Sequence, residues 1–360
     1  AGEGVGACHQ IVANLKIGAS VDAEAGGQPS ATANGDDTGG SDDENGIASF
    51  PTFAAGQSAT VPVTVMNMTG GAARLYGFID WNKDGDFNDL NEAVSVSVPN
   101  GTNGLINLNF TVPITAVLNM NLGARFRLST QTGLTATSCA PDGEVEDYMV
   151  QAVGYDYGDL PDNNLAGSYP TDATNGAGEG IGACHQIIPN LKIGAIVDVD
   201  AAAQPDALAE GDDNNGIPDD EDGVTIFPDF LLGNPATVNV SVMNMTGSAA
   251  TLYGFIDWNK DGDFLDANES VSSPVPNGTN GNVALNFNVP ANAVVNMCLG
   301  FRIRLSNQAG LTATGCANSG EVEDYQIEVL GFDYGDLPDN DLAGSYPTNT
   351  NNGAGEGGGA

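Results

Sequence analysis

The sequence is poor in basic residues. Its 360 residues include 9 Lys and Arg against 47 Asp and Glu, which gives a formal net charge of −38. Nucleic acids and anionic membrane surfaces are bound through basic patches, and this composition does not supply one. The charge balance therefore excludes both as partners and favours cations.

Long apolar runs are also missing. No stretch approaches the roughly 20 apolar residues that a transmembrane helix needs, so we expect no membrane insertion. Hydrophobic residues still make up 41% of the chain, and they gather in alternating runs that should fold. The chain starts at Ala1 with no signal peptide, and residues 354–360 repeat its first seven residues with one change, Gly358 in place of Val5. These ends suggest an excerpt from a longer tandem array whose partners are neighbouring copies of itself.

Histidine is nearly absent. Only His9 and His185 occur, at the same place in two long repeats. Neither is accompanied by the nucleophile and orienting group that Ser-His-Asp or Cys-His catalysis requires. Acidic residues are too numerous to single out a carboxylate pair for glycoside hydrolysis. The sequence therefore favours a protein that is not an enzyme, with histidines in structural roles or as occasional metal ligands.

Cysteine is scarce, and no C-x-x-C pair suggests a zinc site. Cys8 and Cys139 recur as Cys184 and Cys316. Two pairings are open: Cys8 with Cys139 inside a repeat, which we favour, or Cys139 with Cys184 across the junction. Either is typical of an oxidising, extracellular setting. Cys298 has no cysteine counterpart and is expected to be an unpaired, small buried hydrophobe.

The most specific motif in the sequence occurs twice. Residues 77–87 read G-F-I-D-W-N-K-D-G-D-F, and residues 254–264 repeat them without change. Asp, Asn and Asp alternate with other residues and precede Gly, as at the start of a calcium loop. The expected Ca²⁺ ligands are Asp80, Asn82, Asp84, Asp86 and Glu92 in the first copy, and Asp257, Asn259, Asp261, Asp263 and Glu269 in the second. Asp86 and Asp263 are expected to contribute a backbone carbonyl.

This loop departs from an EF-hand. Its twelfth position is Asn91, or Asn268 in the second copy, and the Glu follows one place late. The residues before it are aromatic and β-branched, which places the loop between strands. The alternative is an Asp/Asn/Gly turn whose residues merely suit its backbone. Trp81 and Trp258 lie inside the loops, where we expect them to pack onto the fold rather than to stack on sugars.

Acidic, Gly-rich segments separate the strand-rich parts. Their close carboxylates repel one another, which is tolerable in a solvated linker or around a bound cation. Both readings are open, and the repetition of these positions favours further Ca²⁺ sites. The candidates are Asp36, Asp37, Asp42, Asp43, Glu44, Asp212, Asp213, Asp219, Asp220 and Glu221 in these segments, and Glu144, Glu146, Asp156, Asp159, Glu321, Glu323, Asp333 and Asp336 at the end of each repeat. The second group would clamp a cation between domains and stiffen the array.

Alternating runs predict an all-β fold. Residues 59–68 place Val61, Val63 and Val65 on one face, with the period of two of a half-buried strand. Similar short runs follow, without a helical pattern of useful length, and together they predict tandem β-sandwich modules joined by acidic Gly-rich linker segments. The expected parts are an acidic segment at 1–43, a sandwich at 44–154, an inter-repeat segment at 155–220, a second sandwich at 221–331 and the start of another inter-repeat segment at 332–360.

Two further motifs recur in both repeats. G-E-V-E-D-Y stands at residues 143–148 and 320–325, and D-Y-G-D-L-P-D at 156–162 and 333–339. With the F-I-D-W-N-x-D-G-D-F loops, they resemble the GEVED domain repeats of large bacterial secreted and cell-surface proteins. The resemblance implies β-sandwich modules in multidomain extracellular proteins, for which adhesion or surface structure is the usual supposition.

The chain departs from that family pattern at a few places. Cys8 and Cys184 stand where an Arg before the His is more usual, and Asn45 stands where the second copy has Asp222. The cysteines suggest disulfides special to this protein.

The sequence favours a structural extracellular protein of the bacterial cell surface, a fibre or stalk in which Ca²⁺ rigidifies tandem sandwiches. Charge repulsion would keep the metal-free array extended and flexible, and bound Ca²⁺ would neutralise the joints. The alternative is an adhesin module that binds a glycan or a protein on another surface. The Asn-x-Thr motifs at Asn67 and Asn244 are candidate glycosylation sites.

Overall fold

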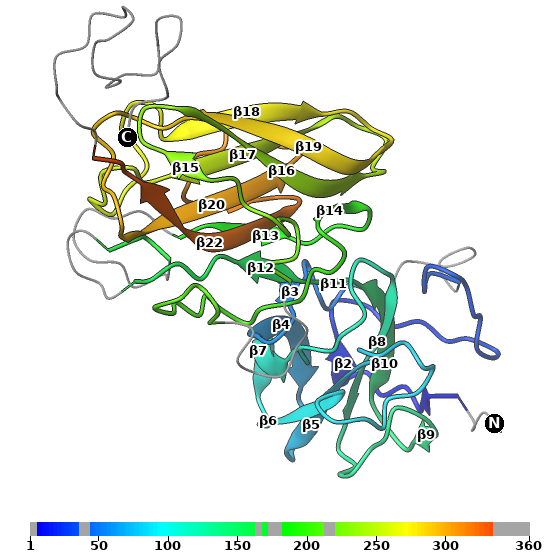
Figure 1. Ribbon diagram of the computed structural model, residues 1–360. Coiled ribbons are helices and arrows are strands. Elements are labelled where there is room, and N and C mark those ends of the chain that lie inside the picture. The colour runs from blue at the N-terminus through cyan, green and yellow to red at the C-terminus, as the bar shows by residue number, and fades with distance from the viewer. Residues whose placement is uncertain (1–5, 36–43, 163–167, 172–181, 212–219, 334–360) are drawn as a thin grey trace, which may run out of the picture.

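The structure is a computed structural model that describes residues 6–35, 44–162, 168–171, 182–211 and 220–333. Within these ranges every regular element is a strand. The described residues contain no helix that is long and apolar enough to cross a membrane. Figure 1 shows two β-sandwiches, one from each repeat, that meet through the segment between them. The predicted all-β tandem architecture is confirmed.

Repeat 1 packs two antiparallel sheets against each other. One sheet has the order β10-β8-β5-β6, formed by Glu144–Val150, Leu122–Ser129, Ala73–Ile79 and Ala93–Val98. The other has the order β2-β4-β7, formed by Leu15–Ile17, Ser58–Asn67 and Thr102–Thr111. Two short parallel pairs complete it: β1 (Cys8–His9) with β9 (Cys139–Ala140), and β3 (Phe53–Ala54) with β11 (Ala152–Val153).

Repeat 2 has the same layers. Its larger sheet has the order β15-β22-β20-β17-β18, formed by Phe230–Leu231, Glu321–Leu330, Cys298–Ser306, Ala250–Ile256 and Ser270–Val275. The facing sheet is β14-β16-β19, formed by Leu191–Ile193, Pro235–Asn244 and Thr279–Asn288. A third, small sheet joins β12 (Tyr155–Tyr157), β13 (Cys184–Gln186) and β21 (Cys316–Ala317). Because β12 follows repeat 1 directly, this small sheet ties the two repeats together.

The core of each sandwich lies between its sheets. Val61, Val63 and Val65 alternate along β4 and are fully buried, which confirms the inward face that the sequence predicts. Trp81 packs edge-on against Phe53 and Phe110, with ring centroids 5.3 and 6.2 Å apart. Such edge-to-face contacts add about 0.5–1.5 kcal/mol each to the stabilisation from buried area.

The acidic Gly-rich segments belong to the sandwiches. β2 lies in the segment 1–43 and pairs with β4, and β14 lies in the segment 155–220 and pairs with β16. Their Ile17 and Ile193 side chains are fully buried in the two cores. The expected divisions at 43/44 and 220/221 follow composition, whereas the strand pairing and the core extend across them.

The disulfides lie within the repeats. Cys8 is bonded to Cys139, and Cys184 to Cys316. Each bond joins directly paired residues of a parallel strand pair, β1 with β9 or β13 with β21. Cys298 is unpaired as expected, but it is exposed. The expectation of a buried Cys298 is wrong because this residue is the first of β20, where the strand emerges at the end of the sheet.

Candidate metal centres

The repeated D-x-N-x-D-G loop connects β5 to β6, and β17 to β18 in the second copy, as the sequence predicts. Its chain curls around Asp80, whose Oδ1 accepts a hydrogen bond from the Asp84 amide (3.1 Å) and whose Oδ2 accepts one from the Gly85 amide (3.0 Å). Lys83 and Gly85 have φ angles of 57° and 94°. The left-handed backbone at Gly85 favours a residue without a side chain, which explains the glycine of the motif.

Oxygen atoms converge inside this loop. Carboxylate oxygens of Asp84, Asp86 and Asp89 lie within 4.8 Å of one another, and Asn82 Nδ2 donates to Asp89 Oδ2 (2.6 Å). The second loop repeats the Asn–Asp contact between Asn259 and Asp266 at 2.6 Å. Carboxylates and amide oxygens are the ligands that hard cations such as Ca²⁺ prefer.

Asp89 and Asp266 were not among the ligands predicted from the sequence. Their recurrence at the same place in both loops was an available signal. The spacing of the calcium-loop motif did not reveal these two residues, because the chain bends back on itself to bring them to the start of the loop.

Glu92 closes the base of the loop. Its side chain is buried, with Oε1 accepting from the Trp81 amide (3.0 Å) and Oε2 from the Asp89 amide (3.1 Å). The equivalent Glu269 makes the same contacts with Trp258 and Asp266. Burial raises the pKa of Glu269 to about 7, and the nearby charge of Asp257 adds to the effect. A bound cation would relieve this concentration of negative charge.

The two tryptophans pack into the fold. Trp81 and Trp258 are 1% and 2% exposed, and their Nε1 atoms donate to the carbonyl oxygens of Asn91 (3.1 Å) and Asn268 (2.9 Å). This confirms the predicted packing role. Neither ring face is available to stack on a sugar.

A second acidic centre lies at the start of β22. The strand alternation places Glu321 and Glu323 on the same face, and both are at most 1% exposed. The segment that precedes the sandwich crosses this face: the Ile193 amide donates to Glu321 Oε2 (2.5 Å) and the Gly223 amide to Glu323 Oε1 (2.9 Å). The Tyr325 hydroxyl donates to Glu323 Oε2 (2.9 Å).

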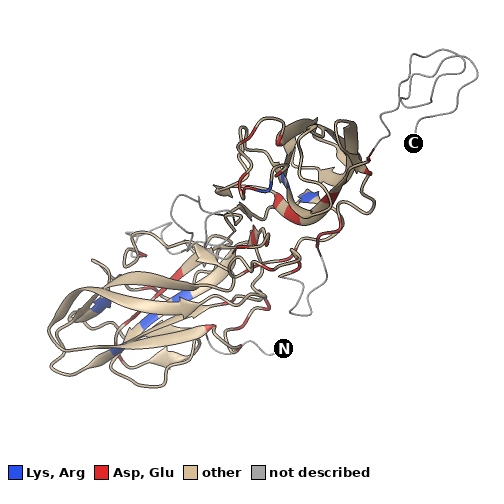
Figure 2. Cartoon of the chain, turned by 60° about the vertical axis from the view of Figure 1, so that its left-hand side comes forward, with Lys and Arg blue, Asp and Glu red and all other residues tan. Residues whose placement is uncertain are grey.

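Two more buried carboxylates join this centre. Asp156 Oδ2 accepts from the Val322 amide (2.6 Å), and Asp220 Oδ2 accepts from the Asp198 amide (3.1 Å). We call Asp156, Asp220, Glu321 and Glu323 the joint cluster, because Asp156 comes from the segment after repeat 1 and the others belong to repeat 2. Figure 2 shows Asp and Glu gathered where the two sandwiches meet, while Lys and Arg lie mainly on the strands.

The joint cluster has an unsatisfied oxygen. Among the described residues, no donor reaches Glu321 Oε1, which is buried. Burial, and then the charges of Glu323, Asp156 and Asp220, raise the pKa of Glu321 well above its usual range. An ionised carboxylate in this position costs several kcal/mol unless a positive charge is close. The four carboxylates of the joint cluster are therefore suitable ligands for a hard divalent cation.

The corresponding face of repeat 1 carries the same pair of buried glutamates. Glu144 and Glu146 are buried, the Ile17 amide donates to Glu144, and the Gly46 amide donates to Glu146 Oε1 (2.9 Å). Among the described residues of this repeat, no carboxylate takes the place that Asp156 has in repeat 2.

The other predicted ligands differ in burial, and Glu221 and Glu44 lie near enough to Tyr325 and Tyr148 for their charges to act on those hydroxyls. Asp159 is buried and accepts from the Gly211 amide (2.6 Å), Glu44 and Glu221 are partly buried, and Asp333 is exposed. The rest lie outside the described residues: Asp36, Asp37, Asp42, Asp43, Asp212, Asp213, Asp219 and Asp336.

Comparison with protein families matches the GEVED domain at residues 74–151 and 251–328. The chain contains two GEVED domains. Each match runs from β5 or β17 into the last long strand, β10 or β22, and so includes one D-x-N-x-D-G loop and one G-E-V-E-D-Y motif. The resemblance seen in the sequence is confirmed. A search of curated proteins found no match.

Solved structures similar to the two GEVED domains are distant. A 1.5-MDa bacterial ice-binding adhesin is 11% identical, with a TM-score of 0.24 over 88% of this chain and 64% of that one. Red sea bream transglutaminase is 11% identical, with a TM-score of 0.22 over 80% of this chain and 30% of that one. The CBD12 unit of CALX1.2 is 8% identical, with a TM-score of 0.21 over 78% of this chain and 97% of that one. At these scores the similarities carry no functional argument.

The two histidines are structural. His9 Nδ1 donates to the Asp142 carbonyl (2.7 Å), and its Nε2 accepts from Arg127 Nε (2.9 Å). His185 makes the same pair of contacts with Ser319 and Arg304. Burial lowers the pKa of His9 to about 4, with the Arg127 charge acting in the same direction. Both nitrogens of the neutral ring are occupied, so neither histidine is placed to act as a catalytic base.

Proposed function

We propose that this chain is a structural, extracellular calcium-binding repeat protein whose GEVED sandwiches are fixed into a stiff fibre or surface stalk by Ca²⁺ at the joints. The observation that carries the proposal is Glu321 Oε1, a buried oxygen without a donor among the described residues, next to three other buried carboxylates. A cation there holds Asp156, which directly follows repeat 1, against repeat 2. It would therefore restrict bending between the repeats.

The chemistry of the joint cluster favours calcium. The ligand atoms that its described residues offer are all carboxylate oxygens, which suit hard cations, whereas Zn²⁺ sites are built mainly from Cys and His. Extracellular Ca²⁺ modules bind with dissociation constants of about 0.1–1 mM. At millimolar Ca²⁺, each site then adds about 0.4–1.4 kcal/mol to the stability of the folded state.

The D-x-N-x-D-G loops would serve as a brace inside each sandwich. Asp80, Asn82, Asp84 and Asp89 lie on one loop that is anchored at its base by Glu92. Because the loop joins neighbouring strands of one sheet, a cation there stabilises the repeat without linking it to the next. Sensing by helix movement has no counterpart in this strand–loop–strand arrangement.

An extracellular, non-enzymatic role agrees with the remaining chemistry. One disulfide in each repeat is typical of oxidising compartments. The two histidines are neutral and hydrogen-bonded on both ring nitrogens.

The proposal is tested by isothermal calorimetry and thermal unfolding of the full chain with Ca²⁺ and with EDTA. Glu321→Gln removes a charge from the joint cluster, and Glu144→Gln makes the matched change in repeat 1, where no described residue replaces Asp156. We expect Ca²⁺ to raise the unfolding temperature of the wild type, and Glu321→Gln to lose one calcium equivalent and most of the stiffening seen by small-angle scattering. Glu144→Gln should leave the joint between the repeats stiff. Identical unfolding in Ca²⁺ and EDTA would refute the proposal.

A further inference from the structure

The segment after repeat 1 forms an outer layer on repeat 2. We call residues 155–162 and 168–171 the clasp. Its strand β12 pairs antiparallel with β13, with Asp156 opposite His185. Further backbone bonds run from the Gly158 amide to the Ala183 carbonyl (3.2 Å) and from the Asp200 amide to the Tyr155 carbonyl (2.8 Å). The clasp thus adds an edge strand to a domain that lies later in the chain.

Side chains of the clasp are buried in repeat 2. Leu160 is fully buried in a cluster with Phe255 and Phe264, and its amide donates to Asp324 Oδ2 (3.0 Å). The Tyr169 ring stacks on Phe264 with centroids 5.4 Å apart, and its hydroxyl accepts from the Gly300 amide (2.8 Å). These contacts combine apolar burial with satisfied polar groups, as a specific interface does.

One clasp position tolerates only glycine. A Cβ on Gly158 would collide with the Asp324 carboxylate and would lie 2.8 Å from Arg302 Nη2. These two groups form an ion pair that is completely buried, so they cannot move aside cheaply. The glycine of the D-Y-G-D-L-P-D motif is therefore explained by this close approach.

Within the described residues, no segment takes the place of the clasp on the equivalent face of repeat 1. Among the described residues, β1 pairs only with β9, whereas its counterpart β13 lies between β12 and β21. Cys8 is exposed and Cys184 is fully buried. The Arg125–Asp147 ion pair has side chains 21% and 40% exposed, and its counterpart under the clasp is 0% exposed on both sides.

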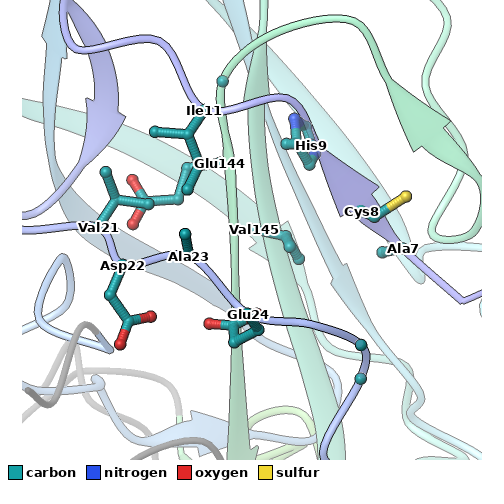
Figure 3. A pocket seen from close by; sticks show the side chains of 13 residues that line it. Ala7, Cys8, His9, Ile11, Val21, Asp22, Ala23, Glu24, Glu144 and Val145 are labelled. Carbon is teal, nitrogen blue, oxygen red and sulfur yellow. The ribbon is translucent and has the colours of Figure 1, made fainter. Parts of the chain in front are cut away.

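A groove follows this open face. It has a volume of 360 Å³ and is lined by Cys8, His9, Ile11, Glu144 and Val145, among others. Figure 3 shows Asp22, Glu24 and Glu144 around it, with His9 and Cys8 along one side. A second groove of 390 Å³ lies beside Arg125 and Asp147.

The aromatic end of the face is open as well. In repeat 2, the ring of Tyr169 lies against Gly300. In repeat 1, a Cβ on the equivalent Gly123 would meet only Phe87, at 3.8 Å. The site that Tyr169 fills in repeat 2 is therefore vacant among the described residues of repeat 1.

The chain carries a second copy of the clasp sequence. Residues 332–348 match residues 155–171 except for Phe332 in place of Tyr155 and Asp341 in place of Asn164. Gly335, Leu337 and Tyr346 stand at the positions of Gly158, Leu160 and Tyr169, the residues that make the buried contacts.

We propose that the open face of repeat 1 binds residues 332–348 of a second copy of this chain, so that copies join head to tail. The contacts are those of the clasp on repeat 2. The inference specifies which residues join one chain to the next in the proposed fibre. It rests on the proposed function only for the biological role of the assembly. Asp333 would bring a further carboxylate to the face that holds Glu144, so docking and Ca²⁺ binding there reinforce each other.

Peptide binding tests the face directly. The receptor is the full chain with Gly335→Val, which disables its own second clasp, and the probe is a fluorescent peptide of residues 332–348. We expect saturable 1:1 binding by anisotropy and at least tenfold weaker binding of the same peptide carrying Gly335→Val. A peptide of residues 155–171 is the matched control and should bind comparably. No saturable binding of the 332–348 peptide, in Ca²⁺ or in EDTA, would overturn the inference.

Crosslinking and sedimentation locate the contact and its source. A photoreactive benzophenone at position 346 of the peptide should label Phe87 and its neighbours, and labelling confined to repeat 2 contradicts the proposal. The wild-type chain should sediment as concentration-dependent oligomers that Gly335→Val abolishes. A wild-type chain that stays monomeric at high concentration would exclude a second copy as the occupant. Peptide binding of equal strength in EDTA supports the clasp contacts while contradicting the coupling between docking and Ca²⁺ binding at the face that holds Glu144.

Discussion

At the scale of residues, the two GEVED domains differ most in how far equivalent ion pairs are buried. Arg302 donates to both carboxylate oxygens of Asp324, from Nε at 2.7 Å and from Nη2 at 2.6 Å, in full burial. Arg125 and Asp147 have the same bidentate geometry in a partly exposed setting. The ion pair should therefore contribute unequally to the stability of the two repeats.

Asp324→Asn should destabilise repeat 2 by about 3–5 kcal/mol, because it leaves the buried Arg302 without its partner charge. The matched change Asp147→Asn should cost about 1 kcal/mol or less, because solvent screens that pair. Chemical denaturation followed by the fluorescence of Trp258 or Trp81 separates the two repeats. Equal losses in the two variants would show that burial under the clasp does not matter.

The two histidines give a pH dependence whose sign is fixed by their burial. The folded-state pKa of His9 is about 4, below the unfolded value near 6.5. As the pH falls, the unfolded chain binds the proton first. The contribution of neutral His9 is therefore present above pH 6.5 and is lost as the pH falls toward 4, by up to about 3 kcal/mol.

Proton NMR of the imidazole signals measures this directly, since the chain has only two histidines. We expect no titration of either ring between pH 8 and 5.5 in the folded protein. A midpoint near 6.5 for His9 would contradict the hydrogen-bonded, neutral ring.

Local motifs made part of the site predictable from the sequence. Asp80, Asn82 and Asp84 are ligand candidates because their spacing alone brings them to one turn. The special position of Glu321 could not be predicted in this way. Its buried acidic surroundings include Asp156 and Asp220, which two other segments of the chain bring to β22.

At the scale of elements, the sequence pattern predicted a long strand but not the short strands. The alternation of Val61, Val63 and Val65 predicted β4 and its buried face, because a strand of ten residues records its environment in its pattern. The pairs β1–β9 and β13–β21 have strands of two or three residues. No periodicity exists at that length, so their pairing was not predictable.

The short pair β1–β9 is held by its disulfide. Replacing Cys8 and Cys139 together by Ser should destabilise repeat 1 by about 2–5 kcal/mol, because the bond closes a loop with a sequence separation of 131. Cys298→Ser is the matched control and should leave the stability unchanged, because Cys298 is exposed and unpaired. Thermal unfolding under non-reducing conditions provides the comparison. An unaffected double variant would mean that strand pairing alone fixes this edge.

At the scale of the whole molecule, each GEVED domain is completed by chain that composition assigns to a linker. Composition alone separated the acidic Gly-rich segments from the sandwiches, because Gly and Asp are unfavourable in strands. The structure nevertheless places β12, β13 and β14 in these segments. These strands form because of long-range contacts with β16, β21 and β22, which residue propensities do not predict. The clasp makes neighbouring repeats interdependent and gives the array its direction.

The central claim is that Ca²⁺ binds where the segment after repeat 1 meets repeat 2. A crystal structure of the full chain grown in millimolar Ca²⁺, with an anomalous difference map, tests it most directly. The account predicts a calcium peak at the joint cluster, with oxygen atoms of Glu321 and Asp156 at about 2.3–2.6 Å from it. A map with no peak at the joint cluster, while Glu321 stays buried, would contradict the account.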